Sequence, residues 1–193
     1  MASDFNTPFN KYKKPYFTFP EIPSTNEFGF EKLTEENFQH LYLLFEGDTS
    51  PFVDERFKTF QGAEEYTKYL CQYGTILPKH GGQDWLFKWN DEYAGIVHLY
   101  DLSLENFAQN DKRAWIGFAT AEKFRNRKIS HQAVNYFIQY IFDYYPAINF
   151  IHAMTLKENE RATCFLTKCG FAVDNEERLS KKYSFFIRER ACI

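Results

Sequence analysis

The chain has little sulfur and no long apolar segment. Its 193 residues include 2 Met and 4 Cys, and the cysteine spacing fits neither a zinc-binding motif nor a redox Cys-x-x-Cys pair. We therefore expect reduced thiols, most of them buried, at Cys71, Cys164, Cys169 and Cys192. No run approaches the ~18 consecutive apolar residues of a membrane-spanning helix. The first residues lack the apolar core of a secretory signal, so the sequence predicts a cytoplasmic protein.

The chain also lacks a strong charge of either sign. It carries 23 Lys and Arg against 26 Asp and Glu, which gives a formal net charge of −3. This balance provides no global attraction to nucleic acid or to an anionic membrane, and we expect neither as a partner. Aromatic residues, by contrast, are abundant, with 22 Phe and 13 Tyr. Their number predicts a core built largely on rings, with an aromatic-lined pocket as a second use for some of them.

The length suits one domain. Residues 1–26 are rich in Pro, Asn, Ser, Thr and aromatics and predict an irregular arm, whereas residues 27–193 predict a single domain. The apolar patterning predicts strands over 28–33, 84–89, 93–100, 114–120, 148–156 and 181–189, a short strand from 171, and helices over 34–46, 52–73, 130–144 and 159–168. This order is typical of a mixed α+β domain rather than a doubly wound parallel sheet.

Single residues predict where several of these elements begin and end. Gly62 is expected to divide the helical region 52–73 in two, because glycine destabilises a helix interior. Ser130 is suited to cap the helix that ends before Pro146. Asn159 is suited to cap the following helix, which Gly170 closes in a left-handed conformation.

A basic turn lies between the strand 114–120 and the helix that starts near Ser130. It holds Lys123, Arg125, Arg127 and Lys128. The first N–H groups of a helix lack intrahelical partners and carry partial positive charge, so cations beside them predict an anion site suited to a pyrophosphate. Charge alone is equally compatible with a solvated basic loop. The position between a strand and an amphipathic helix favours the anion site.

Two segments together resemble the GNAT superfamily of acyltransferases, closest to its RimJ/RimL-like branch. Residues 115–133 resemble its strand followed by R/Q-x-x-G-x-G/A, with Arg125 at the first position and Ser130 at the last. Residues 159–171 resemble its N-x-x-A/S motif followed by K-x-G-F, and the matching residues are Asn159, Ala162, Lys168, Gly170 and Phe171. The likeness extends over roughly residues 28–189. It departs from the family where Asn126 and Lys128 replace glycines.

The resemblance implies a mostly antiparallel, splayed sheet flanked by helices and acetyl-CoA as co-substrate, without a metal. Pantetheine would lie between the strands 114–120 and 148–156 and pair with the backbone of the first one. The cofactor-binding residues implied in this way are Phe118, Ala119, Thr120, Arg125, Asn126, Arg127, Lys128, Ile129, Ser130, Asn159 and Lys168. Asn159 would bond pantetheine or an ordered water, and would also contribute to catalysis. Lys128 would either contact phosphate or crowd the turn.

The general base is less clearly indicated. Many family members carry Glu where Trp115 stands and Tyr where Leu166 stands, and both are absent. His98, on the neighbouring strand, is the leading candidate, because histidine is the side chain that ordinarily titrates near neutral pH. A strand histidine is also often a structural group. Asp101 and Glu31 are the remaining candidates.

Three functions are therefore compared. The first is an N-acetyltransferase in which a primary amine, on a small molecule or a protein N-terminus, attacks acetyl-CoA directly in a ternary complex. The second is a degenerate family member that binds acyl-CoA without turnover, which the missing glycines, Glu and Tyr favour. The third, a nucleic-acid-binding module, is disfavoured by the net charge of −3. The sequence identifies no acceptor, and it leaves a homodimer open.

Overall fold

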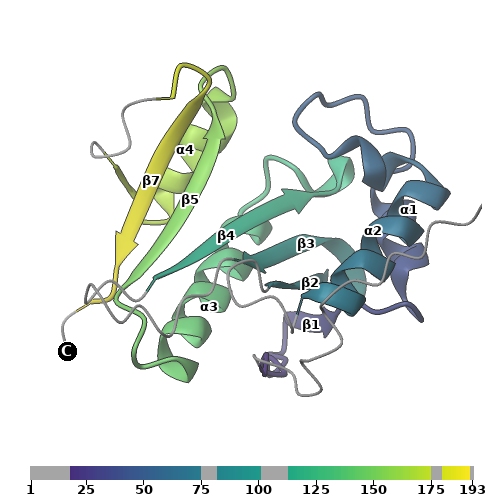
Figure 1. Cartoon of the computed structure of the whole chain (residues 1–193), viewed down its shortest axis with the longest axis horizontal. Helices are drawn as coiled ribbons and strands as arrows, with labels where there is room; N and C mark the ends of the chain where they lie inside the picture. The colour runs from purple at the N-terminus through teal and green to yellow at the C-terminus, as the bar shows by residue number, and fades with distance from the viewer. Residues whose placement is uncertain (1–17, 75–81, 101–112, 175–179, 192–193) are drawn as a thin grey trace, which may run out of the picture.

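The computed structural model describes residues 18–74, 82–100, 113–174 and 180–191 (Figure 1). They form one sheet in the order β1-β2-β3-β4-β5-β7-β6, in which only β4 and β5 are parallel neighbours. The strands are β1 (Phe28–Lys32), β2 (Gly82–Trp89), β3 (Glu92–Tyr100), β4 (Arg113–Thr120), β5 (Phe150–Leu156), β6 (Ala172–Val173) and β7 (Tyr183–Glu189). The helices are α1 (Phe38–Phe45), α2 (Phe60–Tyr73), α3 (Ile129–Tyr144) and α4 (Glu160–Lys168), with 3-10 turns η2 (Glu55–Lys58) and η3 (Glu122–Phe124). The mixed α+β class is confirmed.

The strands β4 and β5 pair only where both begin. Their parallel ladder covers Arg113–Trp115 on β4 and Phe150–His152 on β5. Farther along, β4 keeps β3 as its partner up to Thr120, while β5 keeps β7 up to Leu156. The two halves of the sheet therefore diverge, and Figure 1 shows β5 and β7 turning away from β4. This confirms the splayed sheet that the resemblance implied.

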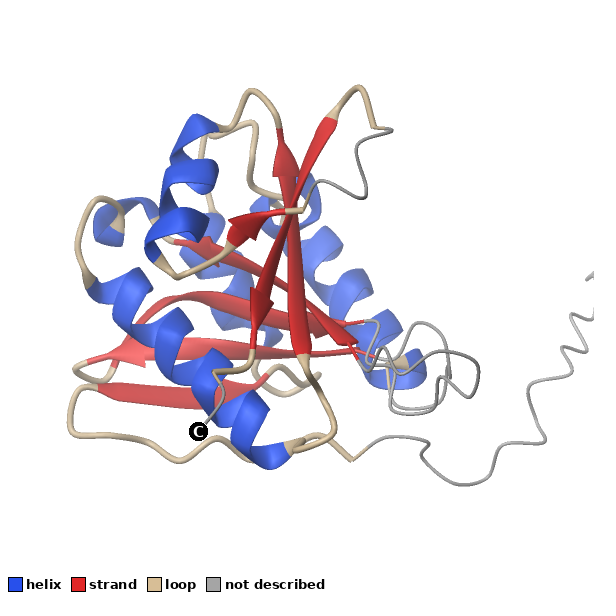
Figure 2. Ribbon diagram, turned by 90° about the vertical axis from the view of Figure 1, so that its left-hand side faces the viewer, coloured by secondary structure: helices blue, strands red, loops and turns tan. Residues whose placement is uncertain are grey.

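Both faces of the sheet are covered by helices (Figure 2). The helices α3 and α4 cover a large core that includes Trp85, Phe87 and Phe137. The opposite face packs against α1 and α2 around residues such as Leu41 and Leu86. Successive side chains of a strand point to opposite faces, so Leu86 faces α1 and α2 while its two neighbours face α3. A polar side chain two positions from Leu86 on β2 therefore also points to the α1–α2 face.

The end of the N-terminal arm lies along α3. Residues 18–26 contain no helix or strand, and three tyrosines in and just after α3 hydrogen-bond to them. The hydroxyls of Tyr136, Tyr140 and Tyr145 donate to backbone carbonyls of residues 18–23 at 2.9–3.0 Å. Phe19 is buried in the α3-side core. The division at residue 26 stays a prediction.

Two helix signals were misread in the sequence. Gly62 lies inside α2 and does not divide it, because the break falls at Thr59, whose hydroxyl accepts from the Gly62 N–H. A Cβ at Gly62 would come within 2.5 Å of the Arg56 carbonyl oxygen, so the glycine allows η2 to pack closely. Ser130 does not cap α3. The residue before that helix is Lys128, and it makes no side-chain cap bond.

The ends of α4 agree with the sequence. The Asn159 side chain accepts from the Ala162 N–H at 3.1 Å and so caps the helix. At the other end Gly170 has a φ of 80°, and its N–H donates to the Thr167 carbonyl. The Phe171 N–H donates to the Leu166 carbonyl, which completes a Schellman closure.

The thiols are less buried than expected. Cys71 and Cys164 are exposed and only Cys169 is buried among the described cysteines, while Cys192 lies outside the described residues. Burial raises the pKa of Cys169 to about 11. No helix in the described ranges is both long and apolar enough to span a bilayer. The same ranges contain no cluster of three His, Cys, Asp or Glu placed to hold a metal ion.

Candidate active site

A cavity of about 560 Å³ opens between the parted strands β4 and β5 and extends beneath α2. Phe118 and Ala119 line it from β4, and Asn159 lines it at the start of α4. His98 on β3 and Asp84 on β2 lie on its α2 side. The structure therefore brings together the predicted base, two predicted pantetheine contacts and the predicted amide in one hollow.

The end of β4 is held on both sides. The Phe118 ring packs against Phe165 of α4, with ring centroids 4.4 Å apart. The Thr120 hydroxyl lies 2.9 Å from that of Ser130 at the start of α3. Ser130 is thus a buried tie between strand and helix rather than a helix cap. The backbone of Phe118, Ala119 and Thr120 is fixed next to the gap where β5 no longer pairs.

The turn before α3 keeps a glycine-like conformation without glycine. Asn126 has a φ of 62°, the left-handed region that asparagine tolerates better than most residues. Lys128 has φ −67° and ψ −9°, which any residue adopts. The two departures from the family motif therefore cost the backbone little strain. The first N–H groups of α3, from Ile129 onward, lie beyond this turn without intrahelical acceptors.

The four basic residues of the turn differ in their surroundings. Lys123 pairs with Glu92, and Arg125 pairs with Asp48, a buried carboxylate between α1 and η2. The Arg125 Nε also donates to the Thr120 carbonyl at 3.0 Å. Arg127 and Lys128 form no ion pair with any residue in the described ranges, so they are the cations left available for an anionic ligand. The Arg125 guanidinium is already engaged.

A hydrogen-bonded group of three side chains lies at the α2 side of the cavity. Asp84 and His98 are directly opposite each other on β2 and β3, and the His98 Nδ1 lies 2.9 Å from the Asp84 carboxylate. The Tyr66 hydroxyl donates to the same carboxylate oxygen at 2.7 Å. The Asp84 side chain is 3% exposed and that of His98 is 17% exposed. This arrangement fixes the imidazole and leaves its Nε2 directed away from Asp84.

The surroundings of His98 support this orientation. Phe57 stacks on the imidazole with centroids 5.9 Å apart. On the next strand Gly117 is its direct neighbour, and a Cβ there would lie 3.1 Å from the His98 Cδ2. Burial, followed by the Asp84 charge, raises the pKa of Tyr66 well above its usual value, so the phenol stays protonated and donates. His98 lies on β3, directly beside the part of β4 that β5 leaves unpaired.

The remaining predicted residues have other surroundings. Asn159 lines the cavity through a side chain whose oxygen caps α4, and no described residue accepts from its amide nitrogen. Lys168 ends α4 outside the cavity lining, and its carbonyl lies 2.9 Å from the His131 Nε2. Asp101 lies outside the described residues.

Glu31, the other candidate base, is engaged away from this cavity. Its carboxylate accepts hydrogen bonds from Lys88 and from the Tyr93 hydroxyl, the latter at 2.6 Å. Burial alone would raise the pKa of Glu31, but these two hydrogen bonds and the charge of Lys88 outweigh it and leave the pKa below its usual value. The carboxylate is thus a weaker base than an unperturbed glutamate.

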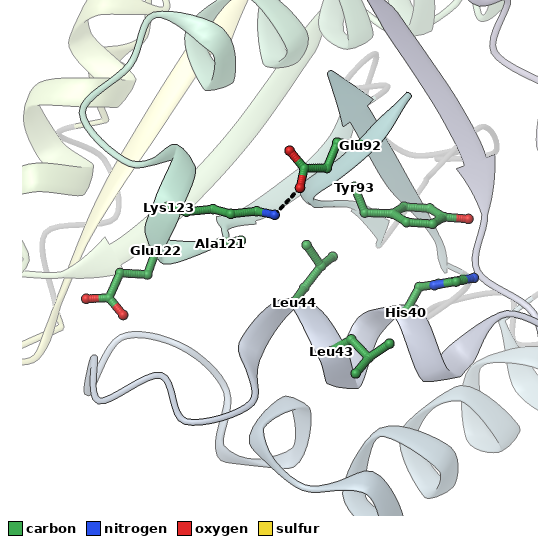
Figure 3. Close-up of a pocket in the computed structure, with 8 residues that line it drawn as sticks. All are labelled: His40, Leu43, Leu44, Glu92, Tyr93, Ala121, Glu122 and Lys123. Atoms are coloured by element: carbon green, nitrogen blue, oxygen red, sulfur yellow. Dashed lines mark hydrogen bonds and ion pairs between the residues drawn. The ribbon is translucent and has the colours of Figure 1, made fainter. Parts of the chain in front are cut away.

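A second hollow, of about 600 Å³, lies between α1, the start of β3 and the turn after β4 (Figure 3). His40 stacks on Tyr93 at one side of it, and Lys123 reaches Glu92 at the other. Of the four cations of the basic turn only Lys123 lines this hollow, where it pairs with Glu92, and none of the other residues predicted to be catalytic or cofactor-binding does.

This geometry agrees with the family comparison. Residues 28–171 match the model of the acetyltransferase (GNAT) family, and the chain belongs to that family. The match spans both motifs on which the resemblance depended. No curated protein sequence matches the chain.

Solved structures share the fold. An acetyltransferase of Salmonella typhimurium that modifies the N-terminal serine of a ribosomal protein has 14% identity and a TM-score of 0.69, with 88% of this chain and 99% of that chain covered. RimL, a ribosomal-protein α-N-acetyltransferase in complex with coenzyme A, has 15% identity and a TM-score of 0.67 over 87% and 97%. The N-acetyltransferase PseH of Campylobacter jejuni, in complex with acetyl coenzyme A, has 15% identity and a TM-score of 0.61 over 85% and 99%. At these identities the likenesses show a shared fold, the one that the resemblance implied.

Proposed function

We propose that this protein is an N-acetyltransferase that transfers an acetyl group from acetyl-CoA to a primary amine, on a small molecule or a protein N-terminus, by direct attack in a ternary complex. The observation that carries the proposal is the gap between β4 and β5 with His98 beside it. Family membership supports the reaction class. Acetyl-CoA, when bound, supplies the acetyl group as an activated thioester.

The residues present fit acetyl-CoA. Beyond Trp115 one edge of β4 has no strand partner, so its backbone groups are available to an extended pantetheine chain. The start of α3 offers N–H groups and, from Arg127 and Lys128, positive charge for a pyrophosphate. The amide nitrogen of Asn159 lies at the same cavity and is available to pantetheine or to a water. Arg125 holds the turn in place through its hydrogen bond to the Thr120 carbonyl and its ion pair with Asp48.

The chain's own groups would act as follows. Asp84 accepts a hydrogen bond from the His98 Nδ1–H, which leaves Nε2 to take a proton from the attacking amine. As the amine nitrogen bonds to the acetyl carbon, the bond from that carbon to sulfur would break and coenzyme A would leave as the thiolate. Backbone N–H groups near Phe118 donate to the thioester oxygen, where negative charge develops. Phe57 and Phe118 flank the site and limit the access of water.

The test begins with a calorimetric titration of the purified protein with acetyl-CoA. We expect a dissociation constant in the micromolar range, and turnover with a panel of primary amines, followed through release of the coenzyme A thiol. His98→Gln should lower kcat about 10²-fold or more, the scale of a general base, and leave acetyl-CoA affinity unchanged. No binding at millimolar acetyl-CoA would refute the function.

A second function, acyl-CoA binding without turnover, remains the alternative. It predicts micromolar binding with no thiol release above the buffer rate for any amine in the panel. The left-handed Asn126 supports acyl-CoA binding under either function, because the turn accommodates the missing glycine, whereas the His98 imidazole held by Asp84 favours turnover. A homodimer and a cytoplasmic location stay part of the proposal.

A further inference from the structure

The wall of the cavity beside His98 carries one fixed cation. Among the described residues that line the cavity, Arg56 is the only Lys or Arg. It belongs to η2, and its guanidinium lies 4.6 Å from the centroid of the Tyr66 ring. Tyr66 in turn hydrogen-bonds Asp84, the partner of His98. The guanidinium therefore lies against one member of the group of three that includes the proposed base.

Asp54 binds the Arg56 guanidinium but occupies only some of its N–H donors. The Asp54 carboxylate accepts from the Arg56 Nη2 at 2.6 Å and from its Nε at 3.0 Å, and also from its backbone N–H at 3.0 Å. The Nη1 group donates to no residue in the described ranges, and the side chain is 56% exposed. Hydrogen bonds from Arg56 hold the pKa of Asp54 below its usual value. The pair is thus a rigid donor with free N–H groups at a cavity wall.

We propose that the acceptor is a small amine that carries a carboxylate, which Arg56 binds while the amine lies at His98. The inference rests on the proposed acetyl transfer and names the class of its acceptor. A planar guanidinium matches a planar carboxylate through paired N–H donors. A phosphate would bring a second negative charge close to Asp54 and Asp84, so the monoanionic carboxylate fits better. A polycationic amine would be repelled by the positive charge of Arg56.

The volume and lining indicate a small molecule with an apolar part. The cavity of about 560 Å³ would also hold the end of the pantetheine arm, so the space left for the acceptor is that of a small molecule. Phe52, Phe57 and Tyr183 contribute rings to its lining. An amino acid with an aromatic side chain combines the amine, the carboxylate and the apolar group that these residues would contact.

The experiment compares each acid with its carboxamide, which has nearly the same size and shape but no negative charge. The probes are phenylalanine with phenylalaninamide, and β-alanine with β-alaninamide, each titrated calorimetrically into protein saturated with coenzyme A and each assayed for acetylation. The variants are Arg56→Gln, Asp54→Asn and, as a matched control, Lys68→Gln. Lys68 is an exposed cation of α2 that pairs with Glu64 and does not line the cavity.

We expect at least one acid to be preferred over its amide about tenfold, the scale of one charge-assisted hydrogen bond. Arg56→Gln should abolish the preference, Lys68→Gln should preserve it, and Asp54→Asn should increase it. Opposite effects at two bonded neighbours cannot come from a general loss of structure in η2. Because each ratio compares two ligands on one variant, differences in amine reactivity cancel between variants.

The inference is overturned if the amides bind as well as the acids, if Arg56→Gln keeps the wild-type ratio, or if neither member of either pair binds the coenzyme A complex. The two proposals fail separately. Acetyl-CoA binding and turnover without any acid preference would remove only the carboxylate site. Failure to bind acetyl-CoA would remove the proposed function, whatever Arg56 binds.

Discussion

Removing Arg125 should expose how the turn before α3 is held. Arg125→Ala leaves the Asp48 carboxylate, whose side chain is 2% exposed, with the Ser50 N–H at 2.8 Å as its remaining donor among the described residues. It also removes the 3.0 Å bond to the Thr120 carbonyl. An unpaired buried charge is the main cost, because the carboxylate can no longer share its charge with a cation or with water.

The magnitude follows from the burial of the pair. Loss of one partner of a buried ion pair costs about 3–5 kcal/mol. The Arg125 side chain is 25% exposed, so water reaches the vacated site in part and the lower end applies, about 3 kcal/mol. For a chain of this size such a loss lowers Tm by roughly 6–12 °C. Arg127→Ala, at a neighbour with no ion pair in the described ranges, should change stability by no more than about 0.5 kcal/mol.

Thermal unfolding of the two variants decides the stability claim. If Arg125→Ala melts within about 2 °C of Arg127→Ala, the ion pair does not stabilise the turn and the reasoning is wrong. Acetyl-CoA titration of Asp48→Asn decides the role of Arg125. If Arg125 positions the turn, removal of the negative charge should weaken binding. A gain in affinity would instead mean that the freed guanidinium contacts phosphate.

Three further outcomes test other parts of the structure. Asp84→Asn should lower kcat about 10²-fold with acetyl-CoA affinity unchanged, because an uncharged amide does not favour the His98 tautomer with its proton on Nδ1 as the carboxylate does. An unchanged kcat would mean that Asp84 does not contribute to catalysis. Gly62→Ala should destabilise by about 1–2 kcal/mol in a denaturant titration, against the gain that Ala normally brings to a helix, because its Cβ would lie 2.5 Å from a carbonyl oxygen. The lowered pKa of Glu31 means that this carboxylate stabilises the folded state above its unfolded-state pKa, and that this stability is lost as pH falls through its folded-state pKa. Glu31→Gln should therefore show a smaller drop in Tm on acidification from pH 7 than the wild type. Equal drops in Tm would contradict the assignment.

Local patterns were sufficient for most of the elements. Alternating apolar residues and the turn at Asn90 and Asp91, whose φ values are 47° and 63°, identify the hairpin of β2 and β3. The stripe of apolar residues in α3 and the closing Gly170 identify the helices around the family motifs. The misreading of Gly62 had a different origin. Its tight contact is with η2, and helix propensity does not contain that information.

The partners of the site residues were harder to predict. Asp48 and Arg125 are 77 positions apart, and Tyr66 and Asp84 are 18 apart. Each pair joins elements whose relative placement is set by packing on the α1–α2 face, which periodicity does not specify. The sequence singled out His98 and left Asp84 unremarked. A buried Asp within the apolar strand 84–89 was the available signal, because a buried carboxylate requires hydrogen-bond partners.

The pairing of Asp84 with His98 depends on one irregularity of the hairpin. Trp89 is opposite Glu92, and an uninterrupted ladder from there would place Asp84 opposite Val97. The register shifts by one residue between Phe87 and Lys88, so β3 contains one extra residue and Asp84 meets His98 instead.

The cores show the effect of this bulge. Tyr93 and Ile96 both pack toward α1 and α2 although they are three residues apart, which regular alternation along a strand forbids. If the same sequence formed a regular strand with no bulge and kept Tyr93 on the α1–α2 face, His98 would turn to the α3 side, away from Tyr66 and the cavity. The bulge therefore places the candidate base. Deleting Ala94 removes the extra residue and restores regular alternation, so Asp84 should stay opposite His98 and activity should persist; loss of activity in a folded Ala94 deletion would contradict the register argument.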